Sequence, residues 1–325
     1  MDKQDKNNKQ KDAALICGSV AYDTIMVFSG QFKNEILPDK VHMLNVSFLV
    51  PKLRREFGGT AGNIAYNLDL LGGNALPMAT VGHDFDEYAH WLDRHGVERG
   101  LVKVVPEAYT AQAYITTDMD DNQITAFHPG AMSFAHTQSI VVQHGDYRVR
   151  FATVSPDGRE GMVSHARELA EAGIPFIFDP GQGLPMFDGE ELKRFIEQAS
   201  YVAVNDYEAE LLMKRTGLTL KQIAAQVQAL IVTHGGKGSH IYVGSKVYDI
   251  PCAHAASLAD PTGCGDAYRG GMLYGLLRGM DWETTGRVAS LMGAIKIERP
   301  GPQNHKTDAE SFRRRFQKEF RYALT

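Results

Sequence analysis

Residues 260–277 read DPTGCGDAYRGGMLYGLL, a glycine-rich loop that runs directly into a helical pattern. Its glycines leave backbone amides unshielded, and the start of a helix adds further free amides and the positive end of its dipole. The stretch therefore predicts an anion site. Asp266 lies at its edge, where a carboxylate can orient a hydroxyl or accept its proton, which favours phosphoryl transfer to an alcohol. The alternative is that Gly263 and Gly265 only form a tight turn and that Asp266 only caps the helix.

The composition is that of a soluble globular protein, with 43% hydrophobic and 22% charged residues in a chain of 325. A net charge of -5 indicates no nucleic-acid partner, and no apolar segment approaches the length of a membrane span. Residues 1–12 are polar and lack the apolar run of a signal peptide, so we expect a disordered tail on a cytoplasmic protein whose folded part is residues 13–325. Cys17, Cys252 and Cys264 fit neither a disulfide framework nor a zinc site and are expected to be reduced thiols.

Strand, loop and helix patterns alternate through the second half of the chain. This alternation predicts an α/β fold with a mainly parallel sheet and helices on both of its faces. Residues 15–23 predict a buried first strand that ends in a small-residue turn and a carboxylate, Asp23. Ligands of open α/β sheets bind at the carboxyl ends of strands, so Asp23 is a candidate substrate ligand, with a turn-forming aspartate as the alternative. The later strands are predicted at residues 150–154, 176–179, 201–204 and 229–233, and residues 239–243 and 246–250 are predicted to form a hairpin with its turn at 244–245.

Two stretches of roughly alternating polarity, at about 27–57 and 102–132, interrupt the first half of the chain. They are predicted to pair into a small separate sheet that acts as a lid. Between them, Gly59 would allow close approach of a ligand, and Asn63 can offer both a donor and an acceptor to vicinal hydroxyls. Close packing of the following helix on the sheet is the alternative explanation for this glycine.

From residue 15 to about 302, the chain resembles the PfkB, or ribokinase-like, family of carbohydrate and nucleoside kinases. The resemblance implies a ribokinase-like α/β fold with a small β-sheet lid, and transfer of the γ-phosphoryl group of ATP to a primary hydroxyl. Four motifs carry it in the family's order: GGTAGN at 58–63, NDYE at 205–208, THGGKG at 233–238 and DPTGCGD at 260–266.

This resemblance implies that Asp266 is the catalytic base and that the amides of Gly263, Cys264 and Gly265 form its anion hole. The position of Asp266 at a helix N-terminus predicts that its ionised form is favoured. Cys264 departs from the alanine common at this position in the family. A thiol at a helix N-terminus can have a lowered pKa, so a cysteine nucleophile is the alternative chemistry.

The same resemblance assigns the ligands of both substrates. It implies that Glu208, with Asn205, organises magnesium and the phosphates of ATP through water. These two residues can suffice because magnesium takes oxygen ligands and waters and does not require a closed protein cage. The residues assigned to the acceptor sugar are Asp23, Gly59 and Asn63, and those assigned to the nucleotide-binding wall are Thr233, Gly235 and Gly238.

Residues 46–59, 127–132 and 179–185 resemble segments of bacterial-type adenosine kinases. The acceptor that this implies is adenosine, phosphorylated on its 5′-hydroxyl to AMP in purine salvage. A purine needs an apolar slot for its faces and polar groups for its edge. Phe48, Phe127 and Met132 are the candidate slot and Gln182 the candidate edge ligand, whereas the alternatives are lid core for the two phenylalanines and a turn for the glutamine.

Two other functions stay open on the sequence. The first is a sugar kinase of the same family, such as a ribokinase or fructokinase. The second is a nucleoside- or sugar-binding protein without turnover, although binding alone requires no base at Asp266. The partners expected are a small-molecule nucleoside, no nucleic acid and no membrane, for a monomer or a homodimer paired through the lid.

Overall fold

The computed structural model describes residues 10–36, 45–120 and 122–324, which form two sheets. The larger sheet has the order β14-β13-β12-β11-β10-β9-β1-β4-β5, with β8 paired to β9. Its strands are parallel except at β8 and at the β12-β13-β14 edge, where the predicted hairpin is found. They are β1 (Lys11–Cys17), β4 (Ala75–Gly82), β5 (Val102–Val105), β8 (Gln143–His144), β9 (Tyr147–Val154), β10 (Phe176–Phe178), β11 (Tyr201–Asn205), β12 (Ala229–Thr233), β13 (Ser239–Val243) and β14 (Lys246–Ile250).

Helices cover both faces of this sheet, and each face has its own hydrophobic core. Successive strand residues point to opposite faces, so in β1 Ile16 joins one core while Leu15 and Cys17 join the other. One core is covered by α2 (Thr60–Leu70), α3 (Asp86–Arg94), α8 (Cys264–Leu277), α9 (Trp282–Ile297) and α10 (Ala309–Phe320), and the other by α4 (Arg159–Glu171), α5 (Gly189–Gln198), α6 (Asp206–Thr216) and α7 (Leu220–Ala224). The predicted ribokinase-like α/β architecture is therefore confirmed.

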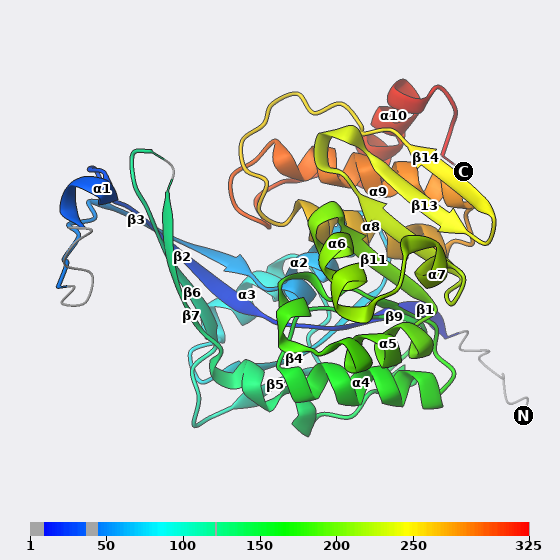
Figure 1. Ribbon diagram of the computed structural model, residues 1–325, viewed down its shortest axis with the longest axis horizontal. Coiled ribbons are helices and arrows are strands. Elements are labelled where there is room, and N and C mark those ends of the chain that lie inside the picture. The colour runs from blue at the N-terminus through cyan, green and yellow to red at the C-terminus, as the bar shows by residue number, and fades with distance from the viewer. Residues whose placement is uncertain (1–9, 37–44, 121, 325) are drawn as a thin grey trace, which may run out of the picture.

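The smaller sheet has four strands and projects from one end of the large domain, with the short helix α1 (Phe32–Glu35) at its far end (Figure 1). Its strand order is β3-β2-β6-β7, in which only β2 and β6 are parallel. Part of the predicted lid, residues 37–44, lies outside the described residues. β5 falls within the second predicted lid stretch but pairs with β4 of the large sheet. The four strands are β2 (Ala21–Val27), β3 (Lys52–Gly58), β6 (Ala111–Thr117) and β7 (Gln123–His128).

The first strand differs from its prediction at both ends. Lys11 and Asp12, predicted as part of a disordered tail, pair with β9 and begin β1, while the rest of that tail up to residue 9 lies outside the described residues. At its other end, the chain leaves the large sheet after Cys17 and enters the small one at Ala21. Gly18 permits this crossing, because a Cβ there would lie 2.6 Å from the Thr60 hydroxyl. Asp23 therefore lies on a lid strand rather than at the end of the first strand.

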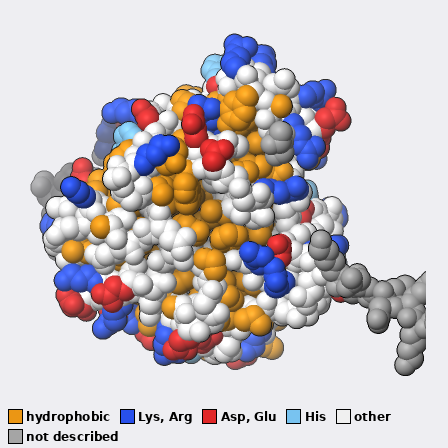
Figure 2. Space-filling model, turned by 90° about the vertical axis from the view of Figure 1, so that its right-hand side faces the viewer, with side chains coloured by type: hydrophobic (Ala, Val, Ile, Leu, Met, Phe, Trp, Pro, Cys, Tyr) orange, Lys and Arg blue, Asp and Glu red, His pale blue; other side chains and the backbone are white. Residues whose placement is uncertain are grey.

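The face at the right of Figure 1 carries charges of both signs. In Figure 2, hydrophobic side chains run through the middle of this face, and lysines and arginines are scattered among aspartates and glutamates around them. On this face the basic residues do not form the continuous patch that a nucleic-acid surface requires. Within the described ranges, no helix combines the length and the apolarity needed to cross a bilayer.

Candidate active site

A cavity of about 1150 Å³ lies between the lid strands, the carboxyl ends of the large-sheet strands and the start of α8. Parallel strands all end at the same edge of a sheet, which brings together residues that are far apart in the sequence. With the exception of Phe48, every predicted site residue lines this cavity. These residues are Asp23, Gly59, Asn63, Phe127, Met132, Gln182, Asn205, Glu208, Thr233, Gly235, Gly238, Gly263, Cys264, Gly265 and Asp266.

Phe48 instead forms part of an aromatic cluster beside α1. Its ring centroid lies 4.9 Å from that of Phe28 and 5.0 Å from that of Phe32. Tilted aromatic pairs at this separation are favourable, and they hold the Phe48 ring in the lid. The prediction that Phe48 forms the apolar slot is not supported by this position, which matches the alternative of a lid-core residue.

The loop before α8 presents amides to the cavity, as the glycine pattern predicts. Gly263 has φ 80°, a left-handed conformation, and a Cβ there would lie 2.8 Å from Pro302. The Cys264 amide donates to the Pro261 carbonyl at 3.1 Å and so closes the turn. The amides of Gly263 and Gly265 make no hydrogen bond to the described part of the chain. These two amides, rather than that of Cys264, are therefore available to an anion at the helix N-terminus.

The Cys264 thiol is not activated. Burial raises its pKa to about 11, which outweighs the opposing charge of Lys296. Its Sγ donates weakly to the Gly293 carbonyl at 3.8 Å. The alternative of a cysteine nucleophile with a lowered pKa is thus contradicted, because a neutral thiol is a poor nucleophile.

Asp266 is held by a chain of hydrogen bonds from α2 and α3. Asn63 donates through Nδ2 to Asp266 Oδ2 at 2.8 Å, and Gln303 donates through Nε2 to Asn63 Oδ1 at 2.9 Å. The Trp91 indole in turn donates to Gln303 Oε1 at 2.9 Å. These bonds fix which end of the Asn63 amide faces Asp266. Gln303 and Trp91 lie outside every predicted motif, and no local pattern distinguishes them from ordinary surface residues.

Burial raises the pKa of Asp266 to about 7, although the Asn63 hydrogen bond and the Arg269 charge oppose this shift. The carboxylates of Asp179 and Asp23 add to it. The predicted preference of Asp266 for its ionised form is thus outweighed by desolvation. A carboxyl group with a pKa near neutrality is suited to accept a proton at physiological pH.

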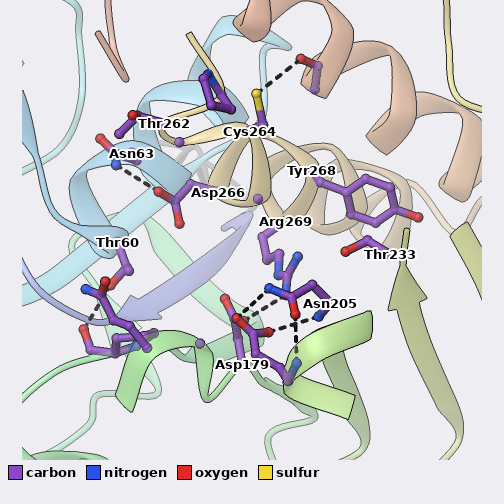
Figure 3. A pocket seen from close by; sticks show the side chains of 18 of the residues that line it. Thr60, Asn63, Asp179, Asn205, Thr233, Thr262, Cys264, Asp266, Tyr268 and Arg269 are labelled. Atoms are coloured by element: carbon purple, nitrogen blue, oxygen red, sulfur yellow. Dashed lines mark hydrogen bonds and ion pairs between the residues drawn. The ribbon is translucent and has the colours of Figure 1, made fainter. Parts of the chain in front are cut away.

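Arg269 and Asp179 form a buried ion pair at the same end of the sheet. Arg269 Nη2 donates to Asp179 Oδ1 at 2.9 Å and to the Ala203 carbonyl at 3.0 Å. The two side chains are only 5% and 7% exposed, and both residues line the cavity. In Figure 3 Arg269 reaches from α8 toward Asp179, with Asn205 beside them. Sequence reasoning missed both residues, although Arg269 follows Asp266 by three positions and so shares its face of α8.

Asn205 and Glu208 form the capping box of α6. The Glu208 amide donates to Asn205 Oδ1 at 2.8 Å, and the Asn205 amide donates to Glu208 Oε2 at 2.9 Å. Burial raises the pKa of Glu208, while the Asn205 amide and side chain oppose the shift. The box holds the carboxylate at the cavity wall, where Oε1 also accepts from Asn205 Nδ2 at 2.9 Å. Across residues 10–36, 45–120 and 122–324, no cluster of three or more His, Cys, Asp or Glu could hold a metal. A cation beside Glu208 therefore requires ligands from phosphates and water.

Asp23 and Asp157 are further carboxyl groups in the cavity wall. Burial raises the pKa of Asp23 to about 6, reinforced by the charges of Glu56 and Asp260. Burial also raises the pKa of Asp157 to about 8, and one of its oxygens has no hydrogen-bond partner among the described residues. Sequence reasoning missed Asp157, because nothing in its neighbourhood indicates that it is buried.

The two glycines at the end of β3 serve packing as well as access. A Cβ on Gly58 would lie 2.7 Å from Asp23 Oδ2. Gly59 has φ 83°, and a Cβ there would lie 2.6 Å from the backbone of Ser19 and Ala21. The close packing that the sequence left open is thus present, and it brings the lid strands directly against the start of α2.

Comparison with known proteins finds similar proteins over most of the chain. A family model described as pfkB family carbohydrate kinase matches residues 20–309. The nucleoside kinase of Methanocaldococcus jannaschii is 31% identical over 271 residues, 80% of this chain and 85% of that protein. The adenosine kinase of Saccharomyces cerevisiae is 27% identical over 165 residues, 46% of this chain and 48% of that protein.

Among solved structures, the nucleoside kinase of Burkholderia thailandensis in complex with inosine is 53% identical. It superposes with a TM-score of 0.86 and covers 96% of this chain and 99% of its own. The same protein in complex with ADP-inosine is 54% identical in the aligned part, with a TM-score of 0.84 over 96% of this chain and 98% of its own.

Proposed function

The chain belongs to the pfkB family of carbohydrate kinases, and within that family we propose that it is a nucleoside kinase acting on purine nucleosides, adenosine included. Its class of reaction is ATP-dependent phosphoryl transfer to a hydroxyl. The proposed reaction transfers the γ-phosphoryl group of ATP to the 5′-hydroxyl of the nucleoside. With adenosine the product is AMP, and the reaction is one of purine salvage.

The observation that carries the nucleoside assignment is the mixed lining of the cavity. Alongside Asp266 and Asn63, which suit a sugar hydroxyl, the wall includes the apolar side chains of Ile115, Phe127 and Met132. A purine presents two apolar faces that need such a wall, whereas a free sugar presents hydroxyls on most sides. The cavity of about 1150 Å³ also exceeds the ~300–1,000 Å³ typical of a site for one small ligand, which suits a nucleoside and a nucleotide together.

The chain's own residues divide the reaction between them. Asn63 and Asp23 orient the ribose, and Asp266 orients the 5′-hydroxyl and accepts its proton late in the transfer. The amides of Gly263 and Gly265 stabilise the charge of the transferring phosphoryl group. Thr233, Gly235 and Gly238 form the wall for ATP. Glu208 and Asn205 would hold magnesium through water, and the bound ion would neutralise phosphate charge.

The assignment of purine bases as a group, rather than adenine alone, has support in the relatives. The Burkholderia enzyme binds inosine, whose base differs from adenine at its hydrogen-bonding edge. In this chain Gln182 lines the cavity, and its amide offers both a donor and an acceptor. An amide can therefore match either edge by rotation.

The choice between a monomer and a lid-paired homodimer stays a prediction.

The test of the proposal is ATP consumption with a panel of acceptors: adenosine, inosine, guanosine, ribose, fructose and fructose phosphates. We expect kcat/KM for adenosine and inosine to exceed that for every sugar, because only nucleosides occupy the apolar wall. Clear preference for a free sugar would instead support the ribokinase or fructokinase alternative. Binding of nucleosides with no ATP consumption would support the non-catalytic alternative.

The pH dependence follows from the raised pKa of Asp266. The active form is the carboxylate, so kcat/KM should rise with pH and level off above about 7, the pKa that burial gives Asp266. One pH unit below that pKa about a tenth of the group is ionised, so kcat/KM should be about tenfold below its plateau. The measurement is kcat/KM for adenosine from pH 5.5 to 9 at saturating ATP. A profile that is flat from pH 5.5 to 8 would contradict the assigned pKa.

A further inference from the structure

Lys296 is a lysine with no exposed surface. It lies in the last turn of α9 and contacts Asp260, the first residue of the glycine-rich loop 260–266 at the start of α8, which we call the anion loop. Moving an ammonium group out of water costs several kcal/mol unless partners compensate, so fully buried lysines are rare. Neither the family motifs nor the proposed mechanism uses this side chain.

The partners of Lys296 are backbone carbonyl oxygens. Its Nζ donates to the Asp260 carbonyl at 2.6 Å and to the Arg299 carbonyl at 3.4 Å. No carboxylate of the described residues lies within 4.0 Å of Nζ. The ammonium charge is therefore solvated by peptide dipoles and is not cancelled by a direct ion pair.

Asp260 is the point where the anion loop is attached to α9. The amides of Ala259 and Asp260 both donate to the Ile297 carbonyl, at 2.8 and 3.2 Å. The Asp260 side chain accepts from the Gly301 amide at 2.8 Å. Lys296 thus adds a charged hydrogen bond to the residue from which the turn toward Gly263 begins.

The charge of Lys296 acts on the start of α8. Burial lowers the pKa of Lys296, while Cys264, Asp260 and Asp266 oppose the shift. Conversely, Lys296 is among the groups that work to lower the pKa of both Asp260 and Cys264. Charges in a buried, low-dielectric region interact over longer distances than in water. The loop that carries the free amides therefore lies in the positive field of this ammonium.

We propose that Lys296 is a positioning residue for phosphoryl transfer. Its ammonium group fixes the anion loop through the Asp260 carbonyl and strengthens the positive field at the amides of that loop. It touches neither the phosphate nor the acceptor, and it acts through the amides of Gly263 and Gly265. The proposal rests on the phosphotransferase reaction and is independent of which nucleoside is accepted.

The first test compares Lys296→Met with Lys306→Met. Methionine is unbranched and nearly as long as lysine but carries no charge, and Lys306 is an exposed lysine in the loop that follows α9. For Lys296→Met we expect kcat to fall by about 10- to 100-fold with little change in the KM of the nucleoside, somewhat less than the loss of a direct oxyanion donor. For Lys306→Met both parameters should stay at the wild-type values. Rates are normalised to the folded fraction from thermal unfolding.

The second test is chemical rescue of Lys296→Ala, which leaves space beside the two carbonyl oxygens. Ammonium or methylammonium chloride should restore part of kcat, and K⁺ should act similarly because carbonyl oxygens coordinate it. Tetramethylammonium chloride at equal ionic strength has no N–H to donate and should not. All assays use the acceptor that the wild type turns over best, so failure of the nucleoside assignment does not affect them.

The outcomes separate a positioning role from a merely structural one. A structural role lowers the melting temperature but leaves the folded enzyme with wild-type kcat. A folded Lys296→Met variant with kcat within twofold of the wild type would therefore overturn the proposal. So would a folded Lys296→Ala variant whose kcat does not respond to ammonium. If the alanine variant does not fold, the methionine variant decides.

Discussion

The Asp266→Asn enzyme is expected to turn over roughly 100-fold or more slowly than the wild type while binding adenosine nearly as well. Asparagine has the same shape, and its side-chain oxygen can still accept the Asn63 hydrogen bond that is 2.8 Å long in the wild type. It cannot accept the proton of the 5′-hydroxyl. The loss is therefore confined to the chemical step, where a positioned general base contributes about 10²- to 10⁴-fold.

The measurement pairs kcat from ATP consumption with the adenosine Kd from calorimetry. Asp249→Asn is a suitable control, because Asp249 is 84% exposed on β14 and does not line the cavity. The inflection near neutral pH should also disappear from the profile of Asp266→Asn, since the titrating group is gone. Full turnover in this variant would remove Asp266 from the catalytic role.

The features that the sequence predicts well are those decided by neighbouring residues. The loop at 260–266 needs glycine at position 263 because φ is 80° there, and that requirement is visible in the motif itself. The central strands β10, β11 and β12 of the large sheet are nearly continuous apolar runs because both of their faces are covered, so their order along the chain could be recognised. The hairpin of β13 and β14 is likewise local, with Gly244 at its turn.

The features that escaped prediction depend on contacts between distant segments. Arg269 and Asp179 are 90 positions apart, and Gln303 and Asn63 are 240 apart, so no spacing rule connects them. The raised pKa of Asp266 likewise depends on contacts between distant segments. The sequence shows that Asp266 lies at a helix N-terminus, which favours a lower pKa. The burial that raises the pKa instead follows only from the surrounding lid, strands and α2.

Phe48 illustrates a different limit. An aromatic residue in a lid can face either the cavity or the lid's own interior, and both positions satisfy its need for burial. The alternation of a strand does not settle the choice, because Phe48 precedes β3 in a segment without regular structure. Its contacts with Phe28 and Phe32 come from the way the chain folds back beside α1.

The second large effect is expected at the buried ion pair. Replacing Arg269 by methionine should lower the free energy of unfolding by about 3–5 kcal/mol, because it leaves the carboxylate of Asp179, which is 7% exposed, without its cation. Asp179 Oδ1 would then lose its donor, and the carboxylate would keep only the hydrogen bond that the Ser155 hydroxyl donates to Oδ2, 3.4 Å long in the wild type. Because Arg269 also opposes the raised pKa of Asp266, the pH profile of kcat/KM should shift to higher pH in the residual active enzyme.

Urea unfolding of Arg269→Met, Asp179→Asn and the double variant tests this expectation. The double variant should be less destabilised than the sum of the two single changes, since each single change already removes the same interaction. Arg148→Met is the matched control: its partner Asp12 lies at 3.3 Å, but the two side chains are 52% and 43% exposed, and water replaces the lost partner. Equal losses in Arg269→Met and Arg148→Met would mean that burial of the Arg269–Asp179 pair contributes nothing, and additive losses in the double variant would mean that the two side chains act independently.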